Sequence, residues 1–243
     1  MSKPLRALLL AAGLGTRLRP LTLQTPKCLV TIGGEPLLGR WLRQLEAAGC
    51  EAVLVNTHYL ADQVVAYLAS WQGRTMAVES VHEPELLGTA GTLAANREFF
   101  AGATGLLIHA DNAMADELPG LLAAHGQRPS GCLLTMLTFQ SDQPSSCGIV
   151  ETDGQGVVQG FYEKVVMPPG NCANGALYAF NQPFMDWFCS MDQHISDFST
   201  EVIPRLMGQI YTWQASGAYL DIGTPEALRQ AQQIWPQPDG ARP

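Results

Sequence analysis

The chain has 243 residues, 47% of them hydrophobic, and a formal net charge of −8. This length and apolar content suit a folded α/β protein with a sizeable core and exclude a disordered chain. The negative charge argues against a nucleic-acid partner, because no basic stripe is present to neutralise a phosphate backbone. A small anionic substrate remains compatible, since a few placed cations are enough to bind it.

The first half of the chain alternates strand and helix patterns. It opens with a continuous apolar run over 5–12, typical of a strand buried on both faces, and a Gly-, Thr- and Pro-rich loop follows over 13–26. The same reasoning predicts helices and strands at 37–48 (helix), 53–56 (strand), 61–71 (helix), 76–81 (strand), 93–100 (helix) and 105–110 (strand). This alternation favours an α/β fold with a doubly wound, mostly parallel sheet.

The pattern changes in the second half, where short strands are separated by turn residues. We predict strands at 133–137, 148–151, 157–163 and 176–180, and helices at 201–207 and 225–234. Short strands joined by turns indicate antiparallel pairing, so this half is expected to form a small cap fused to the sheet. The predicted organisation is one domain over 1–235, followed by a Pro- and Gly-rich tail over 236–243.

The six cysteines include no C-x-x-C pair and have no His-rich partner segment. A zinc site is therefore not expected, and reduced thiols in a cytoplasmic protein are the simpler interpretation. No apolar stretch is long enough to span a bilayer, so no membrane association is expected.

A glycine-rich loop follows the first predicted strand, with Gly13, Gly15 and Arg17 closely spaced. Ligands of open α/β sheets bind at the carboxyl ends of strands, and glycines there let backbone N–H groups approach phosphate oxygens. The third glycine of a dinucleotide fingerprint is missing, and no G-x-x-x-x-G-K-[ST] motif occurs. Neither a Rossmann dehydrogenase nor a P-loop NTPase is favoured, and the glycines alone would equally suit an ordinary tight turn.

The sequence around this loop settles the choice. Residues 8–38 contain L-A-A-G-L-G-T-R-L-R-P-L-T, then P-K-C-L and G-E-P-L, an almost unbroken match that resembles the signature of the sugar-phosphate nucleotidyltransferases. The resemblance implies a Rossmann-like nucleotidyltransferase fold, with Arg17 and Lys27 on the triphosphate and the migrating phosphoryl group. Fixed cations suit that chemistry, because charge accumulates on non-bridging oxygens in the transition state. It also implies nucleotide binding by Ala11, Ala12, Gly13, Gly15 and Thr16.

Two aspartates are candidate metal ligands. Asp111 follows the buried strand predicted at 105–110, and Asp221 lies in Y-L-D-I-G-T, which resembles the family's W-x-D-I-G-T segment. The resemblance implies that both hold one Mg²⁺, a cation that prefers a few carboxylates together with phosphate oxygens and water. Taken alone, Asp221 would also suit the acidic start of a helix, since Thr224-Pro225 resembles a cap.

Further matches point to the sugar phosphate. The segment F-Y-E-K over 161–164 resembles the family's F-x-E-K-P, which implies that Glu163 accepts sugar hydroxyls and Lys164 holds the phosphate. Asn174, in N-G-A-L-Y, and Gly148 match other sugar-facing positions, and Asn112 completes the implied set. A Glu-Lys dipeptide alone is usually a solvated pair, so this assignment depends on the ordered series of motifs.

The segment over 82–91, H-E-P-E-L-L-G-T-A-G, resembles the family's base-reading loop, with Glu83, Gly88 and Thr89 near the base. An ionised carboxylate only accepts hydrogen bonds, and guanine offers N1–H and N2–H side by side. The segment also looks like that of guanylyltransferases acting on mannose or heptose 1-phosphates. GTP is therefore favoured over UTP or dTTP.

The resemblance as a whole implies an enzyme that condenses an NTP with a sugar 1-phosphate by direct displacement and releases pyrophosphate. Uridylyl or thymidylyl transfer to another sugar 1-phosphate stays open. So does a catalytically silent, sugar-nucleotide-binding regulatory subunit, although such a protein can lose charged residues that this chain keeps. The sequence leaves the oligomeric state open, with a homo-oligomer as one option.

Overall fold

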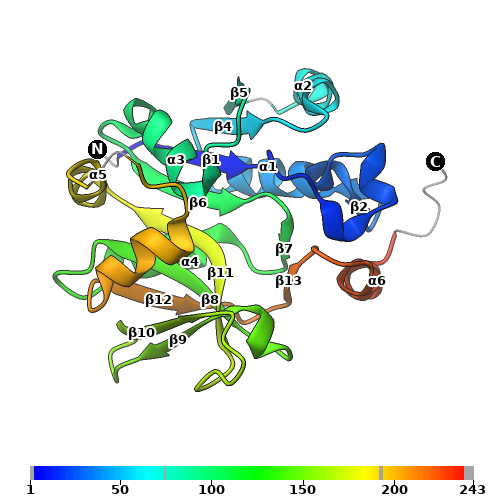
Figure 1. Ribbon diagram of the computed structural model, residues 1–243. Coiled ribbons are helices and arrows are strands. Elements are labelled where there is room, and N and C mark those ends of the chain that lie inside the picture. Colours follow the sequence, from blue (N-terminus) through cyan, green and yellow to red (C-terminus); the bar gives the residue numbers. More distant parts are fainter. Residues whose placement is uncertain (1–2, 74, 192–193, 238–243) are drawn as a thin grey trace. The chain divides into compact units, whose positions relative to one another are not determined.

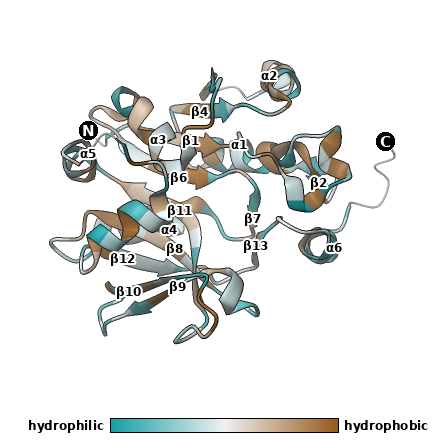
Figure 2. Ribbon diagram, viewed as in Figure 1, coloured by the Kyte–Doolittle hydropathy of each residue, from teal (hydrophilic) through white to brown (hydrophobic). Residues whose placement is uncertain are grey.

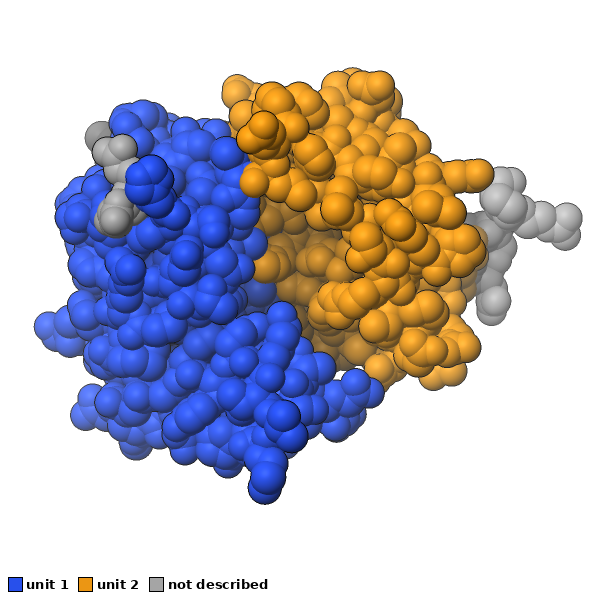
Figure 3. Space-filling model, in the orientation of Figure 1, with its two compact units in different colours: residues 1–6, 87–108, 118–216 blue, residues 7–86, 109–117, 217–243 orange. Residues whose placement is uncertain are grey.

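The computed structural model describes residues 3–73, 75–191 and 194–237. It divides into two compact units, which Figure 3 colours separately. Unit 1 contains residues 1–6, 87–108 and 118–216, and unit 2 contains residues 7–86, 109–117 and 217–243. Each unit is thus built from three separate stretches of chain. Within the described residues, no helix combines the length and apolar content needed to cross a bilayer.

Unit 2 contains the strand order β1-β4-β5, which Figure 1 shows in blue to cyan. Its elements are β1 (Leu5–Leu10, most of which lies in this unit), α1 (Leu37–Ala47), β4 (Ala52–Thr57), α2 (Ala61–Ser70) and β5 (Ala77–His82). Strands β4 and β5 are parallel and are joined through α2. Figure 2 shows β1 as strongly hydrophobic, in keeping with its buried apolar run.

Two short ladders complete unit 2. Strands β2 (Thr31–Ile32) and β3 (Glu35–Pro36) form one, and β7 (Asn112–Met114) and β13 (Tyr219–Asp221) form the other, both antiparallel. Helix α6 (Pro225–Ile234) follows β13. These pieces share one apolar cluster, made of Val30, Ile32, Leu37, Ala113, Ile222 and Ala231. Burying this cluster fixes the segments that carry the charged residues described below.

Unit 1 contains most of the remaining strands and helices. They are α3 (Gly88–Ala95), β6 (Thr104–His109), α4 (Leu118–Gln127), β8 (Leu134–Gln140), β9 (Gly148–Thr152), β10 (Val158–Glu163), β11 (Cys172–Phe180), α5 (Gln182–Cys189) and β12 (Ile210–Gln214). Strand β11 is central and pairs antiparallel with β6, β8 and β9. Strand β10 extends the sheet antiparallel to β9, and β12 runs parallel to β8.

An aromatic cluster forms much of the core of unit 1. Phe180 lies at its centre, with ring centroids 5.0 Å from Phe100 and 5.0 Å from Phe184. Tyr178 and Phe198 extend it, with their centroids 4.6 Å apart. Tilted and edge-on contacts at these distances are favourable beyond the area they bury. The cluster anchors β11, the strand that carries Asn174.

The α/β class, the strand–helix alternation and the antiparallel second half are confirmed. Helix α6 has the predicted bounds, and most other predicted elements differ by one or two residues. All six cysteines are free thiols; Cys28, Cys50 and Cys132 are buried, whereas Cys189 is exposed. The division between a domain over 1–235 and a tail stays a prediction, and residues 238–243 of that tail lie outside the described residues.

The helix predicted over 93–100 is wrong in both bounds. Helix α3 begins at Gly88, inside the expected base-reading loop, and ends at Ala95, with a separate 3₁₀ turn over Arg97–Phe100. The early start depends on a tertiary contact, because the backbone N–H of Ala90 donates to the carbonyl of Ser196 at 2.9 Å. Asn96 ends the helix, and its Nδ2 donates to the carbonyl of Thr92.

Three other parts of unit 1 differ from the prediction. Helices α4 and α5 are not predicted, because each has a proline in its first turn that breaks the apolar pattern without costing a hydrogen bond there. The helix expected over 201–207 is instead a π turn over Phe198–Val202 followed by a 3₁₀ turn over Ile203–Leu206. Asp197 caps this segment early, and Pro204 lacks the N–H that a regular helix would use.

Candidate active site

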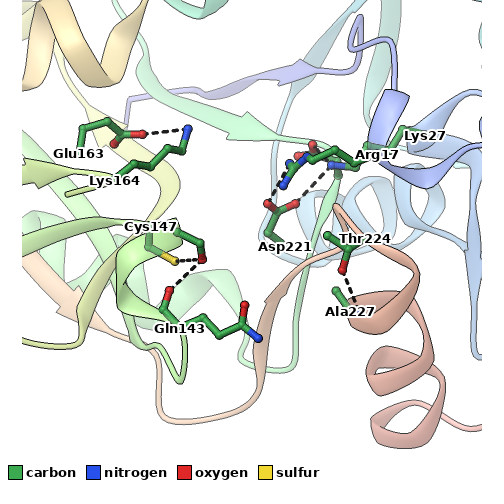
Figure 4. Close-up of polar contacts among 11 residues, drawn as sticks. Arg17, Lys27, Gln143, Cys147, Glu163, Lys164, Asp221, Thr224 and Ala227 are labelled. Atoms are coloured by element: carbon green, nitrogen blue, oxygen red, sulfur yellow. Dashed lines mark hydrogen bonds and ion pairs between the residues drawn. The ribbon is translucent and has the colours of Figure 1, made fainter. Parts of the chain in front are cut away.

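Four charged side chains from distant parts of the sequence lie together in unit 2. Lys27 Nζ donates to Asp111 Oδ2 at 2.5 Å and to Asp221 Oδ1 at 3.2 Å. Arg17 Nη2 lies 3.6 Å from Asp221 Oδ2, and Figure 4 shows Arg17 and Lys27 both pointing at that carboxylate. Only 9% of the Lys27 side chain is exposed. Lys27 is therefore a buried lysine between two carboxylates and not a solvated surface residue.

The β7–β13 ladder brings the two aspartates together. Asn112, next to Asp111, pairs with Asp221 across this ladder, and the backbone N–H of Ile222 donates to the carbonyl of Asp111 at 3.0 Å. Ala113 and Ile222 anchor both strands in the apolar cluster of unit 2. The backbone, and not the side chains alone, therefore sets the separation of the two carboxylates.

The electrostatics of this cluster favour its charged form. Burial alone would lower the pKa of Lys27, but the charges of Asp111 and Asp221 outweigh it and raise that pKa. Burial likewise acts to raise the pKa of Asp111, while Lys27 and then His109 hold it below its usual range. Lys27 and Asp111 are therefore both charged at neutral pH.

The glycines of the first loop permit close packing around the cations. Gly15 has a positive φ of 61°, and a Cβ there would lie 2.9 Å from Cγ2 of Thr22, whose hydroxyl donates to the Gly15 carbonyl at 2.6 Å. A Cβ on Gly223 would lie 2.7 Å from Arg17 Nη2. Larger residues at either position would displace this loop or the Arg17 guanidinium.

Asp221 is not needed to cap the following helix. Thr224 caps α6 instead, since its Oγ1 accepts from the N–H of Ala227 at 3.2 Å, and Pro225 follows at the first helical position. The carboxylate of Asp221 turns to the cations, which removes the helix-start alternative. Both aspartates converge on one ammonium, so they are close enough to share one cation.

The donor set fits a magnesium ion bound together with its substrate. Among the described residues, no group of three or more His, Cys, Asp and Glu side chains is arranged to hold a metal. Two carboxylates alone suit Mg²⁺, which usually takes one or two protein carboxylates and completes its shell with water and phosphate oxygens. Asp111 and Asp221 therefore stay the predicted ligands. In this structure Lys27 donates to both carboxylates, and its ammonium group would have to move for an ion to bind between them.

Three of the predicted nucleotide residues of unit 2 meet at one buried side chain. Asn56, at the end of β4, accepts from the N–H groups of Ala11 at 2.7 Å and Ala12 at 3.3 Å. Its Nδ2 donates to Glu83 Oε1 at 2.9 Å, just beyond β5. The three chain segments thus join at the carboxyl ends of β1, β4 and β5. The Ala11 and Ala12 N–H groups bind Asn56, so the backbone donors for a phosphate must come from later in the loop.

Gly88 and Thr89, also predicted near the base, lie in unit 1 at the start of α3. Thr89 Oγ1 accepts from the N–H of Phe198 at 2.8 Å, and a Cβ on Gly88 would lie 2.4 Å from the Ser196 carbonyl oxygen. Gly88 also has a positive φ of 77°. Glycine is therefore required at position 88 because the backbone of Ser196 lies so close, whether or not this segment also contacts a nucleotide.

The predicted sugar-phosphate residues of unit 1 cluster around the β9–β10 pair. Glu163 is paired with Gly148, and a Cβ on Gly148 would lie 2.5 Å from Glu163 Oε2. Lys164 has a φ of 50°, donates its N–H to the Cys147 carbonyl, and places Nζ 3.1 Å from Glu163 Oε1 (Figure 4). The Lys164 side chain is 68% exposed, so this pair is open to solvent.

Asn174 belongs to the same part of unit 1, since its neighbour Ala173 pairs with Ile149 of β9. Its Oδ1 accepts from the N–H of Ala176, and its Nδ2 donates to the hydroxyl of buried Tyr178 at 2.8 Å. Burial raises the pKa of that hydroxyl well above its usual value.

Asn112 is the other residue predicted to bind the sugar phosphate. It lies in unit 2, where its carbonyl accepts from Trp41 Nε1 at 2.8 Å, and it is paired with Asp221. Its pairing with Asp221 is not foreseeable, because no sequence pattern indicates that β7 pairs with β13.

Comparison with known proteins identifies the family of the chain. The family model described as nucleotidyl transferase matches residues 6–237, almost the whole chain. The chain belongs to the nucleotidyl transferase family.

Curated nucleotidyl transferases match this chain over most of its length. It is 32% identical over 225 residues to mannose-1-phosphate guanylyltransferase catalytic subunit beta of Drosophila melanogaster, covering 91% of this chain and 60% of that protein. It is 31% identical over 224 residues to mannose-1-phosphate guanylyltransferase of Mycobacterium tuberculosis, covering 90% and 61%. The chain therefore spans about three fifths of the length of these relatives.

Solved structures share the fold. A Bacillus anthracis protein assigned as a glucose-1-phosphate thymidylyltransferase, crystallised with sucrose, has a TM-score of 0.85 at 19% identity, covering 98% of both chains. HddC from Yersinia pseudotuberculosis, complexed with GMP-PN, has a TM-score of 0.78 at 22% identity, covering 94% of this chain and 98% of that one. At these identities the likeness supports the nucleotidyl transferase fold alone.

Sequence motifs of the family locate most of these residues but not the residues that hold them in place by hydrogen bonds. Asn56 is not predicted, and Tyr178 is named only as the last residue of the N-G-A-L-Y segment, with no role of its own, although each holds residues that are predicted. For Asn56, one signal is available, because it is a polar residue at the end of the apolar run V-L-V. For Tyr178, the signal is its place at the end of the N-G-A-L-Y segment, although an aromatic residue in a predicted strand is ordinarily a core residue.

Proposed function

We propose that the protein is a sugar-1-phosphate nucleotidyltransferase, which condenses an NTP with a sugar 1-phosphate and releases pyrophosphate. The observation that carries the proposal is the meeting of Arg17, Lys27, Asp111 and Asp221 in unit 2. A chain that had kept only a binding role would not need two cations and two carboxylates in one cluster. Membership of the nucleotidyl transferase family supports the same reaction.

In the proposed reaction, an oxygen of the sugar phosphate attacks the α-phosphorus of the NTP in line and pyrophosphate leaves. Asp111 and Asp221 would hold Mg²⁺, which supplies charge neutralisation for the phosphate oxygens. Arg17 and Lys27 bind the triphosphate and stabilise the charge that grows on its non-bridging oxygens. No side-chain nucleophile is needed, because the attacking phosphate is already ionised.

The acceptor is bound by the residues around β9 and β10. Lys164 is an exposed cation and pairs with the phosphate of the sugar, while Glu163 accepts hydrogen bonds from sugar hydroxyls. Asn174 contributes the amide, held in place by Ala176 and Tyr178. Lys164 Nζ lies 3.1 Å from Oε1 of its neighbour Glu163, so an incoming phosphate competes with the Glu163 carboxylate for Lys164. This ion pair is exposed to solvent and therefore weak.

GTP and a mannose-type sugar 1-phosphate are the proposed substrates. Two relatives at 31–32% identity are named mannose-1-phosphate guanylyltransferases. Glu83 supports guanine on chemical grounds, because a carboxylate accepts several hydrogen bonds and guanine presents two adjacent donors. A heptose 1-phosphate is the second sugar to test.

The test is a matrix of pyrophosphate-release assays with GTP, UTP, dTTP, CTP and ATP against mannose, heptose and glucose 1-phosphates. Turnover that is highest with GTP and mannose 1-phosphate is the expected result. Turnover with UTP or dTTP and glucose 1-phosphate would keep the reaction and overturn the proposed substrates. Absence of pyrophosphate release with every pair, together with measurable NTP binding, would favour a regulatory subunit.

A further inference from the structure

Asn56 contacts three of the predicted nucleotide-binding residues of unit 2. Its Oδ1 accepts from the N–H groups of Ala11 and Ala12, and its Nδ2 donates to Glu83. Asn56 and Glu83 are each only 3% exposed. A buried polar side chain costs free energy unless its hydrogen bonds are made, so these contacts are maintained together.

The contacts of Asn56 also fix which way its amide faces. Two N–H donors meet its oxygen, so turning the amide over would place its own NH₂ group against them. The amide nitrogen must therefore face residue 83, and the atom of residue 83 that meets it must be an acceptor. A carboxylate satisfies this with either oxygen, and its two oxygens together can accept several hydrogen bonds.

We propose that Asn56 is the positioning residue of the base site: by facing its amide nitrogen to residue 83, it decides which hydrogen-bonding group residue 83 offers to the base. With Glu83 the group offered is an acceptor, which suits the N1–H and N2–H donors of guanine. This inference rests on the proposed function, because it takes Glu83 to contact the base.

A reversal of the hydrogen bond between residues 56 and 83 tests the proposal. In Glu83→Gln, the amide oxygen of residue 83 turns to Asn56 and its NH₂ group is offered to the base, so GTP binding falls about tenfold or more. In Asn56→Asp, two carboxylates oppose each other, and GTP binding falls by a similar factor. In the double variant, the new carboxylate at position 56 accepts from the new NH₂ group at position 83, and the amide oxygen at position 83 is offered to the base again. GTP binding therefore recovers to well above that of either single variant.

The measurements are calorimetric affinities for GTP and UTP, KM for both substrates and a thermal melt of each variant. Thr57→Val is the matched control, since Thr57 is buried at the next position of β4 and its hydroxyl donates to Val81. The control should keep GTP affinity, and KM for the sugar phosphate should stay within about twofold across the series.

The outcomes separate this inference from the proposed function. A folded double variant whose GTP loss equals the product of the two single losses would overturn the role of Asn56, whichever NTP the wild type uses. Wild-type GTP affinity in folded Asn56→Asp would overturn it as well. A wild type that binds UTP more tightly than GTP contradicts the proposed base, and the recovery in the double variant is then read with UTP.

Discussion

The two charged clusters of the molecule are stabilised in different ways. In unit 2, Lys27 is 9% exposed and lies between aspartates that are 84 and 194 residues away in the sequence. In unit 1, Lys164 is 68% exposed and pairs with Glu163, its neighbour in the chain. The first cluster depends on tertiary structure, and the second on the local shape of one β-hairpin.

For the proposed reaction, this difference indicates which step each cluster would serve. A buried lysine held between two carboxylates is in place before any ligand arrives, as expected where charge develops during the reaction. A solvent-exposed ion pair has little intrinsic strength and is easily exchanged for a ligand phosphate. Substitutions in the Lys27 cluster of unit 2 should therefore reduce the rate of the chemical step, and substitutions in the Glu163–Lys164 pair of unit 1 should weaken sugar-phosphate binding.

The largest effect is expected from Asp111→Asn and Asp221→Asn. Each removes a predicted metal ligand and a partner of Lys27, so turnover should fall roughly 10³-fold or more. Asp111→Asn should also lower the melting temperature more than Asp221→Asn, since Asp111 makes the shorter contact with Lys27 and its side chain is less exposed. Pyrophosphate release and thermal melts measure both effects, with exposed Asp62→Asn as the control. Wild-type rates in both variants would rule out the metal assignment.

Lys27→Met should separate the two roles of the buried cation. Turnover should fall roughly 10²–10³-fold, because a fixed charge on the triphosphate is lost. Without substrates, however, the variant should bind divalent cations more tightly than the wild type, since Lys27 no longer occupies both carboxylates. Titration with Mn²⁺, followed by electron paramagnetic resonance, measures this affinity. Weaker Mn²⁺ binding in the variant would contradict competition between Lys27 and the metal.

The sequence predicts the charged residues better than it predicts their surroundings. Lys27, Asp111 and Asp221 stand in short motifs whose residue types reflect chemistry, so they are recognisable one segment at a time. What joins them, the β7–β13 ladder, is formed by strands of three residues each, too short to leave a periodic pattern. Long-range pairing of this kind is set by packing and not by local preference.

The same limit explains the misplaced start of α3. G-T-A-G-T at its beginning has low helix preference, and the helix forms there because Ser196, far away in sequence, accepts from its N-terminal N–H groups. Helix α6, in contrast, has its own cap at Thr224 and a proline at the first helical position, and both of its bounds are predicted. Elements with their own end signals are predictable, and elements ended by distant contacts are not.

Lys164→Ala tests the exposed cluster and should act on binding. KM for the sugar phosphate should rise far more than KM for the NTP, by roughly tenfold. A tenfold rise corresponds to about 1.4 kcal/mol, near the lower end of the ~1.5–3 kcal/mol that a charge-assisted hydrogen bond contributes. We expect the lower end because the Lys164 side chain is open to water. Steady-state kinetics with each substrate varied in turn measure the ratio, and Lys3→Ala is the control. An equal rise in both KM values would place Lys164 outside the sugar-phosphate site.

Acid should reduce the stability of the two units at different pH values. This is the smallest effect that we predict. His125 of α4 is buried, its Nδ1 lies 2.8 Å from Thr135 Oγ1, and burial, with a smaller contribution from Arg128, lowers its pKa from 6.5 to about 4. A base whose pKa is lowered by folding contributes stability that is complete above its unfolded pKa and is lost as pH falls from about 6.5 towards 4. At pH 5.5 the loss is about 1.4 kcal/mol. Asp111 has its pKa lowered as well, but from an ordinary value of 3.8, so the contribution of unit 2 is lost only at more acidic pH.

Hydrogen exchange at pH 7.5 and pH 5.5, corrected for the intrinsic rate, distinguishes the two units. Protection should fall in peptides from α4 and β8 while β4 keeps its protection. His125→Gln should remove the difference between the two pH values, and His82→Gln, a substitution of an exposed histidine in unit 2, should leave it in place. Equal loss of protection in β4 and β8 would mean that acid destabilises both units together. His125 would then not be the residue that makes unit 1 less stable to acid than unit 2.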